Sequence, residues 1–367
     1  QPQGDTGGHG DPDAGIQHSA LFPYETDDKI TAGSEHTGSR TIFQVHRDGR
    51  TWQWEPFSMR YAGLYQCERN LYKNIVGDKV LFEEINHDLH LTFRYAWRTS
   101  DTFGFVKSSW LDYHGEDECR IALIDGLQNI MPYGATKLLQ NTLSNLLNAY
   151  KRNEIEPNSG LGIYVLSATL TDRSEPSESL RASVAWQVGL GPVKHLASSG
   201  QLDAFRNGQA VVPEEDVLGR PGAYLVNAEL ALVSGESRHW HIVADVNQEY
   251  GDIVALLRLL ESDSDQLQNR IEADIAQGTD NLVRYVASAD GLQVSADQSA
   301  TAHHFANVVF NIMRGGIFVD GYRVEKRDLL DFVRSRNRPL LSMQAAWFDR
   351  LPDEFDVRDL HAWAGES

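Results

Sequence analysis

The chain has 367 residues, enough for one large domain or two medium ones, and its 41% hydrophobic and 23% charged residues are typical of a globular protein. Lys and Arg total 33 and Asp and Glu total 52, which gives a formal net charge of −19. A surface of this sign repels phosphate backbones and anionic lipid, so nucleic acid and membranes are excluded as favoured partners, whereas neutral sugars are not.

No apolar run is long enough to span a bilayer. Cys67 and Cys119 are too few for a disulfide framework, and we expect two separate thiols rather than a bond. The chain begins at Gln1 instead of Met, which favours processing during export to a periplasm or to the outside, although a fragment boundary would explain it equally.

Residues 1–40 are rich in Gly, Asp, Ser and His and poor in apolar residues, so we expect a flexible lead-in. Short β-type runs follow, and Asp48-Gly49 is a turn signal between the first two. Leu91 and Phe93 alternate with polar residues, which is typical of a half-buried strand. A second pair, Asp125-Gly126, is expected to end a later strand. The strands predicted in this part are residues 41–45, 51–54, 79–85, 89–95, 104–110 and 119–124.

Leucines at helical spacing between Leu138 and Tyr150 predict a helix on the outside of a sheet, after which short strands resume, as in a sandwich or barrel. Beyond Asp252 the apolar spacing becomes helical, with Asp263 and Ser264 where an N-cap belongs. The later strands are predicted at residues 161–170, 180–188, 222–233 and 239–244, and the helices at 253–260, 265–287, 296–313 and 327–336.

The order of elements divides the chain into four parts. They are a flexible segment, a β domain, a helical linker and the start of an incomplete α-helical domain, at residues 1–40, 41–250, 251–295 and 296–367. The helices after the linker are too few to close a large helical barrel, so we expect such a domain to continue beyond this chain.

Three segments carry a resemblance to a known family. Residues 48–56 read Asp-Gly-Arg-Thr-Trp-Gln-Trp-Glu-Pro and residues 65–69 read Tyr-Gln-Cys-Glu-Arg. Residues 119–129 form a strand pattern that ends in Asn, and residues 235–238 read Gly-Glu-Ser-Arg. In order and spacing, these segments resemble the N-terminal region of glycoside hydrolase family 94, which includes cellobiose phosphorylase and the cyclic β-1,2-glucan synthase domains.

The resemblance implies a mainly β fold with C-terminal helices: a galactose-mutarotase-like supersandwich, a helical linker and the start of an (α/α)6 domain. It implies the non-catalytic part of a glycoside hydrolase or phosphorylase that acts on a glucan or oligosaccharide and forms one wall of the substrate cleft. The catalytic acid would lie in the missing catalytic domain of the same polypeptide. A stand-alone carbohydrate-binding or scaffold protein and a mutarotase-like epimerase are the alternatives, and a homodimer is a further arrangement that the sequence leaves open.

Adjacent carboxylates are the first candidates for glycoside chemistry, which needs two of them on either side of one bond. Glu83-Glu84 lie in a predicted strand, so their side chains point to opposite faces and cannot flank one bond. The acidic run 214–216 is expected to be solvated or part of a turn. We therefore predict no catalytic residue.

Sugar sites combine an aromatic face with polar groups for the hydroxyls. Trp54 and Arg60 are the predicted substrate-binding residues, although rings such as Trp52 and Trp54 more often fill a core. Arg314 and Asp320 flank a glycine-rich turn and are the other two predicted substrate-binding residues. A plain helix C-cap at Arg314 explains the same pattern and is slightly favoured.

His239 and His241 are two residues apart on a predicted strand, so both rings project from one face, as two metal ligands would. A zinc site needs a third ligand, and none can be identified from the sequence. Ordinary hydrogen-bonded histidines are favoured, and we predict neither a metal nor another cofactor.

Overall fold

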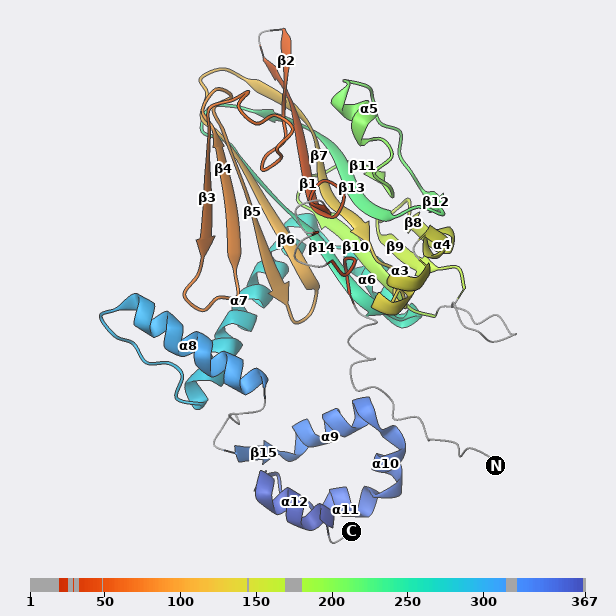
Figure 1. Cartoon of the computed structure of the whole chain (residues 1–367), viewed down its shortest axis with the longest axis vertical. Helices are drawn as coiled ribbons and strands as arrows, with labels where there is room; N and C mark the ends of the chain where they lie inside the picture. The colour runs from red at the N-terminus through yellow and green to blue at the C-terminus, as the bar shows by residue number, and fades with distance from the viewer. Residues whose placement is uncertain are drawn as a thin grey trace. The chain divides into compact units, whose positions relative to one another are not determined.

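The computed structural model describes residues 20–25, 29, 33–47, 49–143, 145–168, 180–314 and 322–365 (Figure 1). It divides into two compact units, one of Gln1–Lys73 and Lys79–Ile275 and the other of Asn74–Asp78 and Ala276–Ser367. The chain is mainly β with helices toward its C-terminus, as the sequence predicts. In the described part, no helix combines the length and the apolarity that crossing a membrane requires.

The first unit is built from two antiparallel sheets. In spatial order, the five-stranded sheet contains β11 (Lys194–Leu196), β13 (Gly222–Leu232), β7 (Cys119–Ile130), β1 (Gly38–Arg47) and β2 (Arg50–Trp54). The nine-stranded sheet contains β12 (Asp216–Leu218), β8 (Lys151–Ile155), β9 (Gly162–Leu166), β10 (Ala182–Val188), β14 (Ser237–Gln248), β6 (Gly104–Tyr113), β5 (Leu91–Ser100), β4 (Val80–Asn86) and β3 (Cys67–Lys73).

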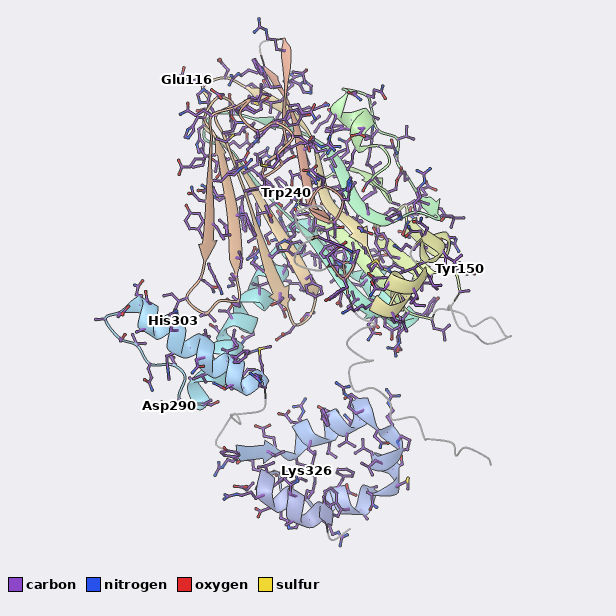
Figure 2. All side chains as sticks on the ribbon, viewed as in Figure 1. Glu116, Tyr150, Trp240, Asp290, His303 and Lys326 are labelled. Atoms are coloured by element: carbon purple, nitrogen blue, oxygen red, sulfur yellow. The ribbon has the colours of Figure 1, made fainter. Side chains whose placement is uncertain are left out.

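The inner faces of the two sheets share one hydrophobic core. Leu91 and Phe93 of β5 point into it from one sheet, and Leu123 and Leu127 of β7 do so from the other. Trp240 of β14, labelled in Figure 2, is also fully buried in this cluster. The alternating pattern predicted for the strand around Phe93 is therefore confirmed, because alternate residues of a strand face the same side.

A buried ion pair crosses the core between the sheets. The ammonium of Lys107 on β6 contacts the carboxylate of Asp125 on β7, and both side chains are fully buried. The indole N–H of Trp240 donates to the same carboxylate over 2.7 Å, and the hydroxyl of Thr41 does so over 2.6 Å. These donors satisfy a charge that would otherwise be costly to bury.

The turn predicted at Asp125-Gly126 is wrong, because β7 continues through both residues. Asp125 lies opposite Thr41 of β1, and its carboxylate points into the core toward Lys107. At Gly126, a Cβ atom would lie only 1.9 Å from the carbonyl oxygen of Tyr224 on β13. The glycine is needed for a close approach between two strands rather than for a turn. Asp48 of the earlier Asp48-Gly49 turn signal lies outside the described residues, and the flanking strands β1 and β2 pair antiparallel with Arg47 opposite Arg50.

Helices cover parts of the sandwich. α3 (Lys137–Leu143) and α4 (Asn145–Ala149) belong to a cluster around Met131 and Leu166, and α5 (Leu202–Arg206) packs near β11 and β13. α6 (Tyr250–Leu260) and the first turns of α7 (Ser264–Ser288) pack on the outer face of β10, β14 and β6.

α7 is attached through its apolar stripe, Leu267, Ile271 and Ile275. The carboxylate of Asp263 accepts hydrogen bonds from the backbone N–H groups of residues 265 and 266, both over 3.1 Å, so Asp263 is the predicted N-cap.

In the second unit, α8 (Gln298–Met313) packs Phe305 and Val308 against Val286 in the last turns of α7. β15 (Arg323–Glu325) and β16 (Glu354–Asp356) pair antiparallel in a small two-stranded sheet, with three helices between them in the sequence. Phe348, Leu351 and Phe355 form the small core of this part. It is completed by α9 (Lys326–Arg336), α10 (Arg338–Met343), α11 (Ala345–Arg350) and α12 (Val357–Gly365).

Candidate functional site

Trp54, the first predicted sugar-binding residue, lies in the sandwich core. Its side chain is 1% exposed, and its indole N–H donates to Oε1 of Glu84 over 2.8 Å. Trp52, two residues earlier on β2, is 38% exposed. A ring as buried as Trp54 has no free face for a pyranose, so its position favours the core role that was weighed against sugar binding.

Arg60 lies on the loop between β2 and β3, with its side chain 43% exposed. Its guanidinium contacts the carboxylate of Glu35 over 3.1 Å. The hydroxyl of Ser58 donates to the same carboxylate over 3.1 Å, and the carbonyl of Ser58 accepts from Arg69, which also binds Glu84. Arg60 is therefore accessible to a ligand, and polar contacts link its surroundings to those of Trp54.

The other two predicted residues belong to the second unit. Arg314 is the C-cap of α8, where its backbone N–H donates to the carbonyl of Phe310 and its guanidinium lies 5.0 Å from the centre of the Phe310 ring. This arrangement matches the helix-cap interpretation. Asp320 lies outside the described residues. A sugar-binding role for either residue stays a prediction.

The adjacent carboxylates have structural partners on opposite faces of β4. Glu84 points inward and accepts hydrogen bonds from Trp54 and from the backbone N–H of Phe57. Glu83 points outward and pairs with Arg94, which also contacts Asp112. Burial alone would raise the pKa of Glu83, but its hydrogen bonds from neighbouring side chains hold the pKa below the usual value. The two groups therefore do not form a catalytic pair.

A surface hollow in the second unit has the chemical character of a sugar site. Its lining includes the part-buried rings of Trp347 and Trp363 and the exposed polar side chains of Gln344 and Arg350. The Arg350 Nε–H donates to the carbonyl of Ala346 over 3.0 Å, which orients the guanidinium. Two rings beside hydrogen-bonding groups offer both the apolar face and the polar contacts that a pyranose needs. Sequence reasoning did not single out these residues.

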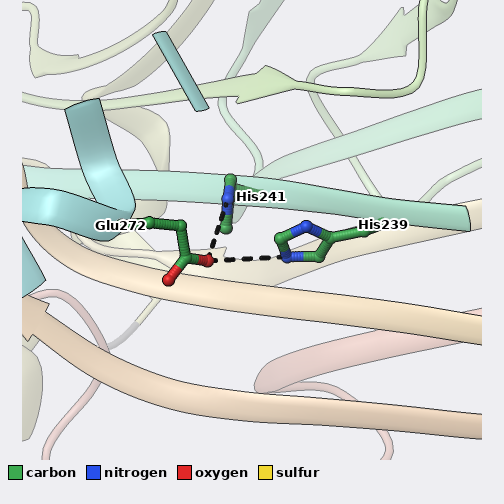
Figure 3. A group of neighbouring side chains, drawn as sticks. All are labelled: His239, His241 and Glu272. Carbon is green, nitrogen blue, oxygen red and sulfur yellow. Dashed lines mark ion pairs between the residues drawn. The ribbon is translucent and has the colours of Figure 1, made fainter. Parts of the chain in front are cut away.

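A second polar cluster lies on the outer face of the nine-stranded sheet. His239 and His241 of β14 project toward Glu272 of α7, as Figure 3 shows. Nε2 of His239 is 3.7 Å from Oε1 of Glu272, and Nε2 of His241 is 3.5 Å from the same oxygen. The pair predicted to share one strand face therefore does so, and it meets a carboxylate there.

Burial sets the protonation of the two histidines, and Arg98 sets that of the carboxylate. Burial lowers the pKa of His239, and burial together with the neighbouring His239 lowers the pKa of His241 to about 3. Burial alone would raise the pKa of Glu272, but hydrogen bonds and charge from Arg98 outweigh it and hold the pKa below the usual value. Near neutral pH the cluster thus consists of two neutral imidazoles and a carboxylate, a donor set that suits a transition metal.

Glu272 is the member of this cluster that the sequence does not indicate. It directly follows Ile271 of the apolar stripe that attaches α7, so it lies at the margin of the buried surface. Gln268, one turn earlier, donates its side-chain amide to the carbonyl of His239 over 3.2 Å. Polar residues at four-residue spacing beside a helical stripe are the only sequence signal, and they do not indicate which strand the helix covers.

Comparison with known proteins finds a family match at one end of the chain. Residues 318–367 match glycoside hydrolase family 149 insertion domain 1. No curated protein sequence matches the chain.

Among solved structures, the chain is similar to a bacterial glucoamylase complexed with acarbose, with a TM-score of 0.39 and 11% identity over 71% of this chain and 35% of that one. It is also similar to a family GH92 alpha-mannosidase from Bacteroides thetaiotaomicron, with a TM-score of 0.30 and 9% identity over 62% of this chain and 26% of that one. For a heparan sulfate lyase from Pedobacter heparinus, the TM-score is 0.27 and the identity is 6%, over 63% of this chain and 28% of that one.

The family match relates residues 318–367, which include the hollow at Trp347 and Trp363, to a glycoside hydrolase domain. The expected relation to glycoside hydrolases is thus found for this segment, whereas family 94 in particular is not shown. The chain spans about a third or less of the length of the solved structures to which it is similar. The TM-scores and identities are too low for these structures to assign an activity.

Proposed function

We propose that the chain is a non-catalytic part of a carbohydrate-active enzyme that acts on a glucan or oligosaccharide. The observation that carries the proposal is the match of residues 318–367 to an insertion domain of glycoside hydrolase family 149. An insertion domain is by definition one part of a larger polypeptide. We therefore place the catalytic acid in another part of the same polypeptide, and the division into a β domain, a linker and the start of a helical domain is part of this proposal.

Two features of the structure support a non-catalytic role. Glu83 and Glu84 are held by separate sets of partners on opposite faces of β4. The hollow at Trp347 and Trp363 combines rings with polar groups, and the described residues that line it include no carboxylate. Such a hollow can bind a sugar without cleaving it, because glycosidic bond cleavage normally requires a positioned acid.

The proposal also includes a more specific relationship, reaction and position for the chain within the enzyme. A relation to family 94, phosphorolysis instead of hydrolysis, and a role as one wall of the substrate cleft are each compatible with a glycoside hydrolase domain. A sugar-binding protein that acts without a catalytic partner is the alternative function, and the hollow favours it as much as it favours an enzyme subdomain.

The test is glucan binding and turnover by the 367-residue chain. We expect a panel of gluco-oligosaccharides to include ligands that bind in calorimetry, with no release of free sugar and, when phosphate is added, no sugar phosphate. Trp347→Ala should weaken binding about tenfold, since stacking on one ring contributes on the order of 1 kcal/mol beyond the apolar area that it buries. Trp347→Phe retains a ring and should keep most of the affinity, and Trp52→Ala, an exposed tryptophan of the first unit, should not change it.

Each result has a distinct meaning. Release of sugar by the chain alone would show that it is catalytic. Absence of binding to every oligosaccharide would refute the carbohydrate role of the hollow. Binding that survives Trp347→Ala and Trp363→Ala would place the sugar site elsewhere, and Arg60 would be the next residue to replace.

A further inference from the structure

The cluster of His239, His241 and Glu272 has no part in the carbohydrate role. Each residue offers one ligand atom, and the three atoms lie within 4.8 Å of one another. His241 is fully buried, and the Nε2 atoms of both histidines are buried without a hydrogen-bond partner in the described part of the chain. Buried polar nitrogen atoms without partners are uncommon and are destabilising unless something else satisfies them.

The distances suit a shared ion better than direct hydrogen bonds. The two Nε2 to Oε1 distances of 3.7 and 3.5 Å are too long for good hydrogen bonds. Metal–ligand bonds of roughly 2.0–2.2 Å place tetrahedral ligand atoms about 3.3–3.6 Å apart. The two distances to Glu272 are close to this spacing, and a contraction of the whole cluster, whose ligand atoms lie within 4.8 Å of one another, would bring all three atoms to bonding distance from one central ion.

The rings are already oriented by their neighbours. The imidazole of His239 stacks on Trp110 with ring centres 4.8 Å apart and planes 3° apart. Nδ1 of His241 is 2.8 Å from the hydroxyl of Ser108. A metal-binding histidine usually donates its second ring N–H to a neighbour, and in the tautomer with the proton on Nδ1, His241 donates to Ser108 and leaves its Nε2 lone pair for an ion.

Arg98 orients the carboxylate. Its guanidinium donates to Oε2 of Glu272 over 2.6 Å and to Oε1 over 2.7 Å. A carboxylate oxygen has two lone pairs, so Oε1 can accept from Arg98 and still bind an ion. The positive charge of Arg98 lowers the affinity for a cation, and the site should therefore be weaker than one that lacks an arginine.

We propose that His239, His241 and Glu272 are the protein ligands of one divalent transition-metal ion, for which Zn²⁺ is the best fit. Two imidazoles and one carboxylate are a donor set that zinc prefers, and three protein ligands leave a fourth position for water or a hydroxyl group. The side chains of Glu272 and His239 are 40% and 31% exposed, so an ion can enter from solvent.

The ion would join two elements of the first unit. Both histidines belong to β14 and the carboxylate belongs to α7, which otherwise packs on the sheet through Leu267, Ile271 and Ile275. Binding to the folded state alone raises stability according to the ratio of free ion to dissociation constant. Zinc should therefore raise the melting temperature of the chain, and chelation should lower it again.

The experiment is a titration of the chelator-treated 367-residue chain with Zn²⁺ by calorimetry, and with Co²⁺ by visible absorption. We expect one ion per chain and the intense absorption of Co²⁺ with four or five ligands. His241→Ala and Glu272→Gln should each weaken binding more than about 100-fold, and Ser108→Ala should weaken it about 10- to 100-fold. His303→Ala, which removes an exposed histidine of α8, is the matched control and should change nothing.

Circular dichroism of each variant without metal separates loss of binding from loss of folding. Glu272→Gln has nearly the shape of the parent side chain, so it keeps the test informative if the alanine variant does not fold. Absence of Zn²⁺ and Co²⁺ binding by the folded parent chain would overturn the proposal. Binding that survives both His241→Ala and Glu272→Gln would overturn it equally, because the ion would then be held elsewhere.

Discussion

Lys107 of the nine-stranded sheet and Asp125 of the five-stranded sheet form an ion pair in which both side chains are fully buried. The pair links the two layers through the middle of their shared core, and Trp240 and Thr41 supply the carboxylate with further hydrogen bonds. Taking two charges out of water is costly, so the net contribution of the intact pair is small. Removing one partner leaves the other charge buried and uncompensated, which is a much larger loss.

Lys107→Met should therefore lower the free energy of unfolding by about 3–5 kcal/mol. Urea unfolding followed by tryptophan fluorescence measures the change. Glu118→Gln is the control, because it breaks an ion pair with Arg120 in which the side chains are 55% and 75% exposed. That variant should lose no more than about 1 kcal/mol. Equal losses in the two variants would show that burial of the Lys107 pair has no energetic consequence.

The buried charge of Lys151 destabilises the folded protein at neutral pH, and this effect should disappear as the pH rises and the ammonium loses its proton. Burial lowers its pKa from 10.5 to about 8, and in the described part of the chain its ammonium contacts only the sulfur of Met131, over 3.6 Å. Between these two pKa values the unfolded chain holds a proton that the folded chain has lost, so stability rises with pH across this window. Below pH 8 the buried ammonium lowers the free energy of unfolding by its full amount, about 3 kcal/mol.

Lys151→Met should accordingly stabilise the protein at pH 7 by up to about 3 kcal/mol and remove this contribution to the rise between pH 8 and 10.5. Urea unfolding at a series of pH values tests both effects. Lys73→Met changes an exposed lysine of β3 and should leave the pH profile as it is in the parent chain. An unchanged profile in the Lys151 variant would mean that the ammonium is solvated in solution.

Gly126→Ala should destabilise the folded protein, whereas Gly278→Ala should stabilise it. At Gly126 the new Cβ would lie 1.9 Å from the carbonyl oxygen of Tyr224 and 2.8 Å from the Cα of Leu225, so two backbones must move apart. Overpacking of this kind costs about 1–3 kcal/mol. At Gly278, inside α7, the Cβ would meet nothing within 4 Å, and alanine should stabilise by about 0.5–1 kcal/mol. Thermal unfolding tests both predictions: the melting temperature should fall in Gly126→Ala and rise in Gly278→Ala.

Alternating apolar residues predict a strand such as β5, whereas the sequence does not predict β3, which has no buried residue, or β8, whose buried residues are partly polar. β5 was predicted because Leu91 and Phe93 alternate with polar neighbours. β8 was missed because two of its buried positions are Lys151 and Asn153. The Asn153 side-chain amide donates to the carbonyl of Arg220 over 3.1 Å, and such a partner cannot be anticipated from local spacing.

In the candidate sites too, local sequence predicts which residues share a strand face but not which residues from other elements meet them. The shared face of His239 and His241 follows from strand geometry, so the sequence predicts it. Glu272 reaches that face only because α7 packs across β14, and the register of a helix on a sheet depends on the whole stripe rather than on one residue. Trp54 has the ring that a sugar site needs, but its burial and its contact with Glu84 favour a core role, and neither follows from local sequence.

β3 is the last strand of the nine-stranded sheet, and no further strand pairs with its outer side in the described part of the chain. Leu71 and Tyr72 are 66% and 51% exposed on it. An open edge with apolar side chains can recruit strands from neighbouring molecules, and charged residues are a common protection against this. Glu68, Arg69 and Lys73 lie on the same strand. Replacing Glu68 and Lys73 by neutral residues would thus be expected to promote aggregation while leaving the folded core, and the contact of Arg69 with Glu84, intact.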